Sequence, residues 1–100
     1  MDTAKKQFVY VLKPHKDDFV NTMSENESSI MGEHFQYLKE LLSRDILILA
    51  GPVTTGEFGL AVLETDSEEE ARNIMINDPA VKKNVMSVKL YPYRVSLLRK

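Results

Sequence analysis

Residues 30–52, IMGEHFQYLKELLSRDILILAGP, contain a helix signal that changes within a few residues into a strand signal. Residues at steps of three and four, all apolar except His34, first mark one face of an amphipathic helix: Ile30, Met31, His34, Phe35, Leu38, Leu41 and Leu42. The aliphatic run 46–50 then predicts a strand, and Gly51-Pro52 after it predicts a turn. We therefore expect a main helix over about 27–44, followed directly by a strand.

Three more strands are predicted on either side of this stretch. The first is the β-branched and aromatic run Phe8–Leu12, which stops before Pro14. The third, over about 58–64, follows a polar hairpin loop over 54–57. In the last strand, over 86–90, apolar and polar residues alternate, so one of its faces should be buried.

A second helix and a polar segment complete the pattern. Ser67, with Glu70 three residues later, predicts a capping box, and the helix that it opens should end near Asn77. The most polar stretch is 15–29, for which we expect a loop with a short helical turn and a capping box over 22–25.

The order β-α-β-β-α-β predicts an α+β, ferredoxin-like fold: a four-stranded antiparallel sheet with two helices on one face. In the first strand Phe8, Tyr10 and Leu12 should face one way, and in the second Leu47 and Leu49 should share a face. Three of the four strands are apolar on both faces, yet the helices can cover only one. The other face would exceed the few hundred Å² of apolar surface that soluble monomers tolerate. We therefore expect a homodimer with the two sheets packed face to face, and the apolar tail Val95–Leu98 docked on the partner.

Composition limits the remaining possibilities. One hundred residues fit a single domain, here 1–100, and the 43% hydrophobic and 28% charged fractions are ordinary for a globular protein. A net charge of −2 gives no reason to expect nucleic acid. The absence of cysteine excludes disulfides and thiolate chemistry and favours a cytoplasmic location. The apolar run Phe8–Leu12 is too short for a signal-peptide core or a membrane span.

His34 interrupts the apolar face of the main helix. An imidazole pressed against the core is partly desolvated and needs a partner; burial disfavours its charged form and a nearby carboxylate favours it. Such a histidine is a candidate general base, and Asp78 is a plausible partner because the two helices pack side by side. Two simpler interpretations stay open: His34 bonds a backbone carbonyl at the core edge, or Asp78 caps a helix that begins at Pro79.

Other candidate sites are weaker. Gly51 and Pro52 could line the mouth of a binding pocket, or form a plain turn. His15 lies beside Asp17 and Asp18, but loop histidines near acids are usually solvated. With two histidines and no cysteine, we expect no metal site and no cofactor.

Five motifs resemble, in order and spacing, the YciI-like (YCII-related) family over about residues 7–94. They are Phe8-Val9-Tyr10-Val11-Leu12, His34-Phe35-Gln36-Tyr37-Leu38, Ile48-Leu49-Ala50-Gly51-Pro52, Ser67-Glu68-Glu69-Glu70-Ala71 and Asn77-Asp78-Pro79. The resemblance implies a dimeric α/β barrel, similar to muconolactone isomerases and small antibiotic-biosynthesis monooxygenases. One member eliminates chloride from a chlorinated hydroxyquinone, which implies a catalytic histidine–aspartate pair at His34 and Asp78. Many relatives carry an arginine before the helix, whereas here the first arginine is Arg44.

Three functions are compatible with the sequence. The first is a small cofactor-independent lyase or isomerase, in which Asp78 fixes the tautomer of His34 and the other ring nitrogen abstracts a proton from a small, possibly cyclic, metabolite. The second is a dimeric module that binds a small molecule for regulation without catalysis. The third is a subunit that dimerises and acts through a partner. An enclosed cavity touching His34 would favour the enzyme.

Overall fold

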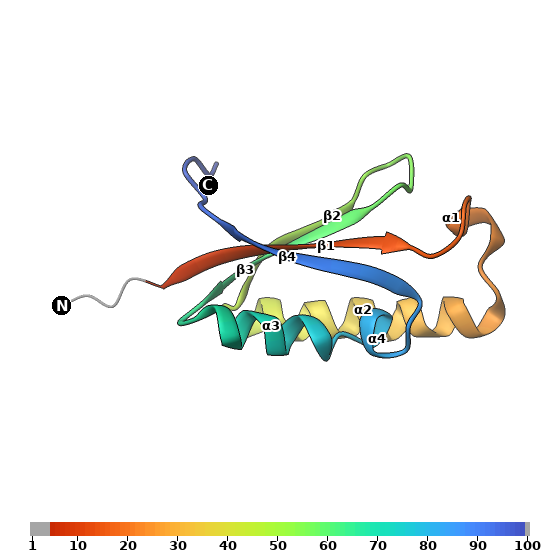
Figure 1. Ribbon diagram of the computed structural model, residues 1–100, viewed down its shortest axis with the longest axis horizontal. Coiled ribbons are helices and arrows are strands. Elements are labelled where there is room, and N and C mark those ends of the chain that lie inside the picture. Colours follow the sequence, from red (N-terminus) through yellow and green to blue (C-terminus); the bar gives the residue numbers. More distant parts are fainter. Residues whose placement is uncertain (1–4, 100) are drawn as a thin grey trace.

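The structure, a computed structural model, describes residues 5–99 and confirms the ferredoxin-like fold (Figure 1). The rest of the predicted 1–100 domain lies outside the described residues. In chain order the elements are β1 (Lys6–Pro14), α1 (Phe19–Thr22), α2 (Glu25–Ser43), β2 (Leu47–Pro52), β3 (Gly59–Thr65), α3 (Glu68–Ile76), α4 (Pro79–Lys82) and β4 (Met86–Tyr93).

The sheet has the strand order β2-β3-β1-β4, and every neighbouring pair is antiparallel. Helices α2, α3 and α4 all lie on the same side of it (Figure 1). Tyr10 marks the centre of the sheet, because it is opposite Ala61 on β3 and Leu90 on β4. Every second residue of β1 points from the sheet into the core beneath the helices: Phe8, Tyr10 and Leu12. The alternation predicted for the first strand is therefore confirmed.

The alternation predicted for the second strand is wrong. We expected Leu47 and Leu49 on the same face, but the register with β3 shifts between them. Leu47 is opposite the core residue Leu63, whereas Leu49 is opposite Val62 on the other face and is 45% exposed. A bulge of one extra residue reverses the facing of every later side chain in a strand. The strand also continues through Gly51 and Pro52, so the turn comes later than predicted.

The main helix differs from the prediction at its start and in part of its buried face. Its capping box consists of Ser24 and Glu27, two residues after the position that we expected. Phe35 and Leu42 are 60% and 53% exposed and are not in the core. Tyr37 is half-buried and packs against the core instead. The face of α2 that contacts the sheet is therefore narrower than the apolar face predicted from the sequence.

The polar segment between β1 and α2 is folded around a small core of its own. Phe19 of α1 packs with Ile30 and Val85 in a second hydrophobic cluster. The segment also touches the hairpin between β2 and β3: a Cβ placed on Gly56, whose φ is +82°, would lie 3.2 Å from a methyl carbon of Val20. Positive φ is a conformation that suits glycine. Glycine therefore allows this close approach at the hairpin tip.

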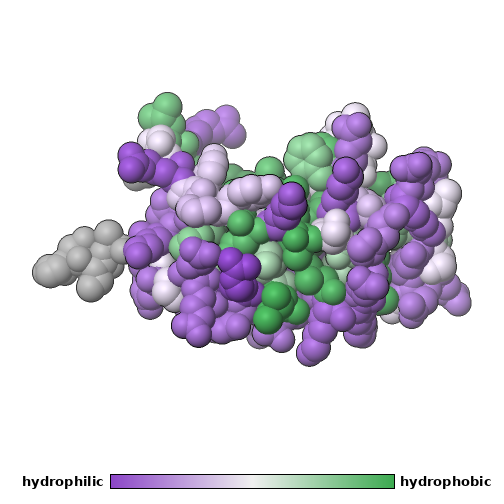
Figure 2. All heavy atoms as spheres, viewed as in Figure 1, coloured by the Kyte–Doolittle hydropathy of each residue, from purple (hydrophilic) through white to green (hydrophobic). Residues whose placement is uncertain are grey.

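The sheet face opposite the helices is called the open face here. Paired residues of antiparallel strands share a face. The register assigns to the open face the apolar and aromatic residues Val9, Val11, Leu49, Leu60, Val62, Tyr91 and Tyr93, together with the polar residues Gln7, Glu64 and Lys89. The hairpin and the C-terminal tail both rise on this side (Figure 1), and Leu97 in the tail is 94% exposed. Hydrophobic atoms are visible at the centre of the molecule and in the tail, among mainly hydrophilic side chains (Figure 2). Within residues 5–99, no helix is long and apolar enough to cross a membrane.

Candidate active site

Asp78 is a fully buried carboxylate at the start of α4. Its Oδ1 atom accepts a hydrogen bond of 2.9 Å from the backbone N–H of Ala80, and Pro79 occupies the first helical turn. These features make Asp78 the N-cap of α4, as one of the sequence-based interpretations proposed. A carboxylate removed from water needs further hydrogen-bond donors, and side chains supply them.

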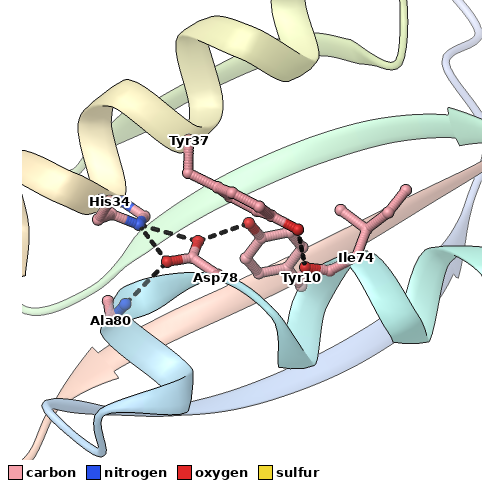
Figure 3. A network of polar contacts seen from close by, with 6 residues as sticks. All are labelled: Tyr10, His34, Tyr37, Ile74, Asp78 and Ala80. Atoms are coloured by element: carbon pink, nitrogen blue, oxygen red, sulfur yellow. Dashed lines mark hydrogen bonds and ion pairs between the residues drawn. The ribbon is translucent and has the colours of Figure 1, made fainter.

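His34 is one of these donors. It projects from α2 toward α4, where its Nδ1 atom lies 2.7 Å from Oδ1 and 2.9 Å from Oδ2 of Asp78 (Figure 3). Because a carboxylate only accepts hydrogen bonds, Nδ1 carries the proton in this contact. Of the interpretations left open for His34, the structure therefore has the contact with Asp78 and not one with a backbone carbonyl. Asp78, in contrast, serves both as a helix cap and as the partner of the imidazole.

The second ring nitrogen of His34 faces a different environment. Nε2 makes no hydrogen bond within residues 5–99, and the histidine side chain is 13% exposed. Every fully buried side-chain nitrogen or oxygen in that range has a hydrogen-bond partner. Nε2 must therefore keep contact with solvent. The imidazole thus has one nitrogen bonded to a buried carboxylate and one that retains contact with solvent.

Tyr10 is a third donor to Asp78, and the sequence-based reasoning did not assign it. Its hydroxyl donates a 2.7 Å hydrogen bond to Oδ2 of Asp78, and its side chain is fully buried. Burial, and then the negative charge of Asp78, raise the pKa of this phenol far above its usual value. A tyrosine in the middle of a buried strand needs a partner for its hydroxyl, and this was the signal available in the sequence.

Tyr37 lies one turn after His34 on α2, beside the ring of Tyr10 (Figure 3). Its hydroxyl donates a 2.7 Å hydrogen bond to the backbone carbonyl of Ile74. Burial, followed by the charge of Asp78, raises the pKa of Tyr37 to about 12. Both phenols are therefore protonated at neutral pH and act as donors next to the carboxylate.

Among residues 5–99, no hydrogen bond joins Gly51 or Pro52 to the cluster around Asp78. They end β2, opposite Leu60 and Gly59, and both are exposed. Their role in binding stays a prediction. His15, Asp17 and Asp18 are exposed, and within residues 5–99 no three His, Cys, Asp or Glu side chains could hold a metal ion together.

A cavity of about 840 Å³ lies elsewhere, between the hairpin and the α1 segment. Six of the residues that line it are Val11, Lys13, Phe19, Val20, Thr55 and Phe58. Its lining includes neither His34 nor Asp78, and neither Gly51 nor Pro52. The cavity and the histidine–aspartate contact are therefore two separate features of the molecule.

Comparison with protein families agrees with this architecture. A model of the YCII-related domain matches residues 7–94. The chain belongs to the YCII-related domain family. The match includes every residue of the cluster around Asp78. No functionally curated protein matches the chain.

Solved structures add neighbours of the same fold. A 5-chloro-2-hydroxyhydroquinone dehydrochlorinase from Burkholderia phenoliruptrix, in complex with 2,5-dihydroxybenzoquinone, is 13% identical and superposes with a TM-score of 0.64 over 87% of this chain and 93% of its own. A dimeric ferredoxin-like protein from an uncultured marine organism is 16% identical, with a TM-score of 0.49 over 99% and 97% of the two chains. An uncharacterised protein from Thermotoga maritima is 13% identical, with a TM-score of 0.44 over 90% and 99%. At these identities the likeness shows the fold alone.

Proposed function

We propose that the protein is a small cofactor-independent enzyme of the lyase or isomerase type, with His34 as its general base. One observation carries this proposal: Nδ1 of His34 is bonded to the buried Asp78, while Nε2 keeps contact with solvent. A base needs an unprotonated nitrogen within reach of the substrate, and the hydrogen bond made by the other nitrogen selects which one that is.

The reaction would start with transfer of a proton from a carbon or hydroxyl of the substrate to Nε2. The electron pair left behind forms a new double bond. In an elimination the leaving group departs with the electron pair of the bond that joined it to carbon. In an isomerisation the proton returns to another atom of the substrate. The imidazolium formed in the first step is stabilised by the adjacent carboxylate of Asp78, without transfer of the second proton.

A small cyclic substrate is the class to test first. The neighbour of the same fold is a dehydrochlorinase in complex with a dihydroxybenzoquinone. Loss of hydrogen chloride requires the removal of a proton, which is the task of a general base. The identity of 13% supports a choice of probe, not a substrate. The probes are 2,5-dihydroxybenzoquinone for binding and 5-chloro-2-hydroxyhydroquinone for chloride release.

The decisive variant is His34→Ala. We expect it to abolish turnover of any substrate found by a thermal-shift screen of the purified protein, because general base catalysis contributes roughly 10²–10⁴-fold. His15→Ala is the matched control, since it removes an exposed imidazole from the polar segment. Unchanged turnover in the His34 variant, with the protein folded, would reject the proposal.

We also propose that the protein works as a homodimer joined through the open face. The support is physical: Leu49, Tyr91 and Tyr93 are each 45–51% exposed on the sheet face opposite α2, α3 and α4. A second copy covers the same face on both protomers by one two-fold axis. Sedimentation at several concentrations tests this, and a single-copy species at micromolar protein would contradict it.

A second candidate function is binding without catalysis. The cavity of about 840 Å³ is large enough for a metabolite and lies apart from His34, which favours a binding module. The two functions predict opposite results for the same pair of variants. If the cavity is the site, a ligand from the screen binds His34→Ala normally and loses affinity for Thr55→Trp, which fills the cavity. If His34 is the site, the losses are reversed.

A further inference from the structure

We infer that Tyr10 is a positioning residue, which holds the Asp78 carboxylate in the orientation that keeps the His34 proton on Nδ1. This inference deepens the proposed function and rests on it, because a fixed tautomer matters only if Nε2 of His34 acts as a base. It assigns a role to a side chain that belongs, by its position on β1, to the hydrophobic core.

The contacts of the carboxylate show how its orientation is fixed. Oδ1 accepts from the backbone N–H of Ala80 at 2.9 Å, and Oδ2 accepts from the hydroxyl of Tyr10 at 2.7 Å. Nδ1 of His34 lies within 2.7–2.9 Å of both oxygens (Figure 3). One donor on each oxygen prevents rotation about the bond to the carboxyl group, and the edge between the oxygens then faces the imidazole.

The backbone contact cannot do this alone. Without the phenol, Oδ1 would keep the bonds to Ala80 and His34, while Oδ2 would have only the shared bond to His34. A buried carboxylate oxygen that has lost one of its donors rotates or admits water to replace it. Either change weakens the preference for a proton on Nδ1 and lowers the fraction of rings with a lone pair on Nε2.

Two further observations fit a positioning role. Tyr10 stays protonated, because burial and then the charge of Asp78 raise its pKa, so it remains a donor at every working pH. Tyr37, the other phenol of the cluster, bonds the backbone of Ile74 and not the carboxylate. The chain therefore contains a matched control: two tyrosines side by side, one bonded to Asp78 and one bonded elsewhere.

The experiment compares Tyr10→Phe with Tyr37→Phe. In protein labelled with ¹⁵N-histidine, the shifts of the two ring nitrogens of His34 report the tautomer, and His15 is the internal reference. We expect the Nδ1–H tautomer to dominate in the wild type and in Tyr37→Phe, and its fraction to fall in Tyr10→Phe. A packing defect alone would not distinguish the two variants in this way.

A chemical probe measures the same property without a substrate. Diethyl pyrocarbonate acylates the unprotonated imidazole nitrogen that it can reach, and mass spectrometry gives the rate at His34 relative to His15. We expect this ratio to fall in Tyr10→Phe and to stay unchanged in Tyr37→Phe. A wild-type tautomer fraction and acylation ratio in folded Tyr10→Phe would overturn the inference.

If Tyr10→Phe does not fold, uniform 3-fluorotyrosine replaces it, because fluorine strengthens the phenol as a donor and adds little volume to the ring. The His34 ring shifts should then move in the fluorinated wild type and in fluorinated Tyr37→Phe alike; unmoved shifts would overturn the inference. These readouts are independent of turnover. An active His34→Ala would reject the proposed function and leave the tautomer result standing, whereas an unchanged tautomer would reject only the role of Tyr10.

Discussion

The two faces of the sheet share the same strands but use them differently. On the helix-covered face, Tyr10 brings a hydroxyl into the core, and that hydroxyl meets the buried carboxylate of Asp78. On the open face, the neighbouring residues Val9 and Val11 bring only apolar surface. A covered face can hold a polar cluster because the cluster satisfies its own hydrogen bonds. The apolar side chains of the open face have no partner within one chain that shields them from water, and this is the reason to expect a second copy.

Asp78→Ala tests the covered face and should lower the free energy of unfolding more than any other variant discussed. It removes the cap of α4 and leaves Tyr10 and His34 without their acceptor. Each buried donor left without its acceptor costs about 1–3 kcal/mol, so the loss of the acceptor of Tyr10 and His34 should lower the free energy of unfolding by about 2–6 kcal/mol. Urea unfolding measures it. Ser67→Ala, which removes the cap of α3 nearer the surface, should cost only about 1 kcal/mol. Equal losses in the two variants would show that the cluster adds nothing beyond a helix cap.

Leu49→Glu tests the other face. A charge buried without a partner at the proposed interface should raise the dissociation constant of the dimer about 100-fold, equivalent to ~2.7 kcal/mol. Analytical ultracentrifugation over a dilution series gives this constant. Ile76→Glu is the matched control, because Ile76 is 49% exposed, close to the 45% of Leu49, but lies at the end of α3 on the helix side. If both variants weaken association equally, the open face is not the interface.

Alkaline pH should lower the free energy of unfolding through the phenols of the covered face. The folded pKa of Tyr37 is about 12 and its ordinary value is 10.0, so the folded state holds the phenolic proton more tightly than the unfolded chain. The stability that this contributes is complete below pH 10 and is lost as the pH rises toward 12. Unfolding free energies between pH 8 and 12 should show a smaller loss in Tyr37→Phe. A loss in Tyr37→Phe as large as that in the wild type would contradict this prediction.

Ser24→Ala should have the smallest of these effects. It removes one half of the capping box of α2, the helix that carries His34, and should cost about 1 kcal/mol. Ser28→Ala, an exposed position in the first turn of the same helix, is the control. Thermal unfolding separates the two, and a Ser28 variant that is as unstable as Ser24→Ala would contradict the assigned cap.

The sequence predicted most of the fold because its signals are local. The alternation through Phe8 and Leu12 and the order of the elements required no knowledge of neighbouring strands. The bulge at Leu47–Leu49 and the exposure of Phe35 depend on how β2 and α2 fit against the rest of the molecule. Pattern alone does not contain that information, and these two predictions were accordingly wrong.

The candidate site shows the same division. The contact of His34 with Asp78 was expected, because each residue breaks or begins a helical pattern in a visible way. Tyr10 was not, because an aromatic residue in a buried strand fits the hydrophobic pattern whether or not its hydroxyl has a task. Its role depends on the meeting of β1, α2 and the start of α4. Tyr10 and Asp78 alone are 68 positions apart in the chain.

The contact between Gly56 and Val20 ties together two loops that are separate in the sequence. An insertion that lengthens the hairpin would drive its tip into α1, and a deletion in the polar segment would pull α1 away. Gains and losses of residues in one loop should therefore be accompanied by compensating changes in the other among members of this family.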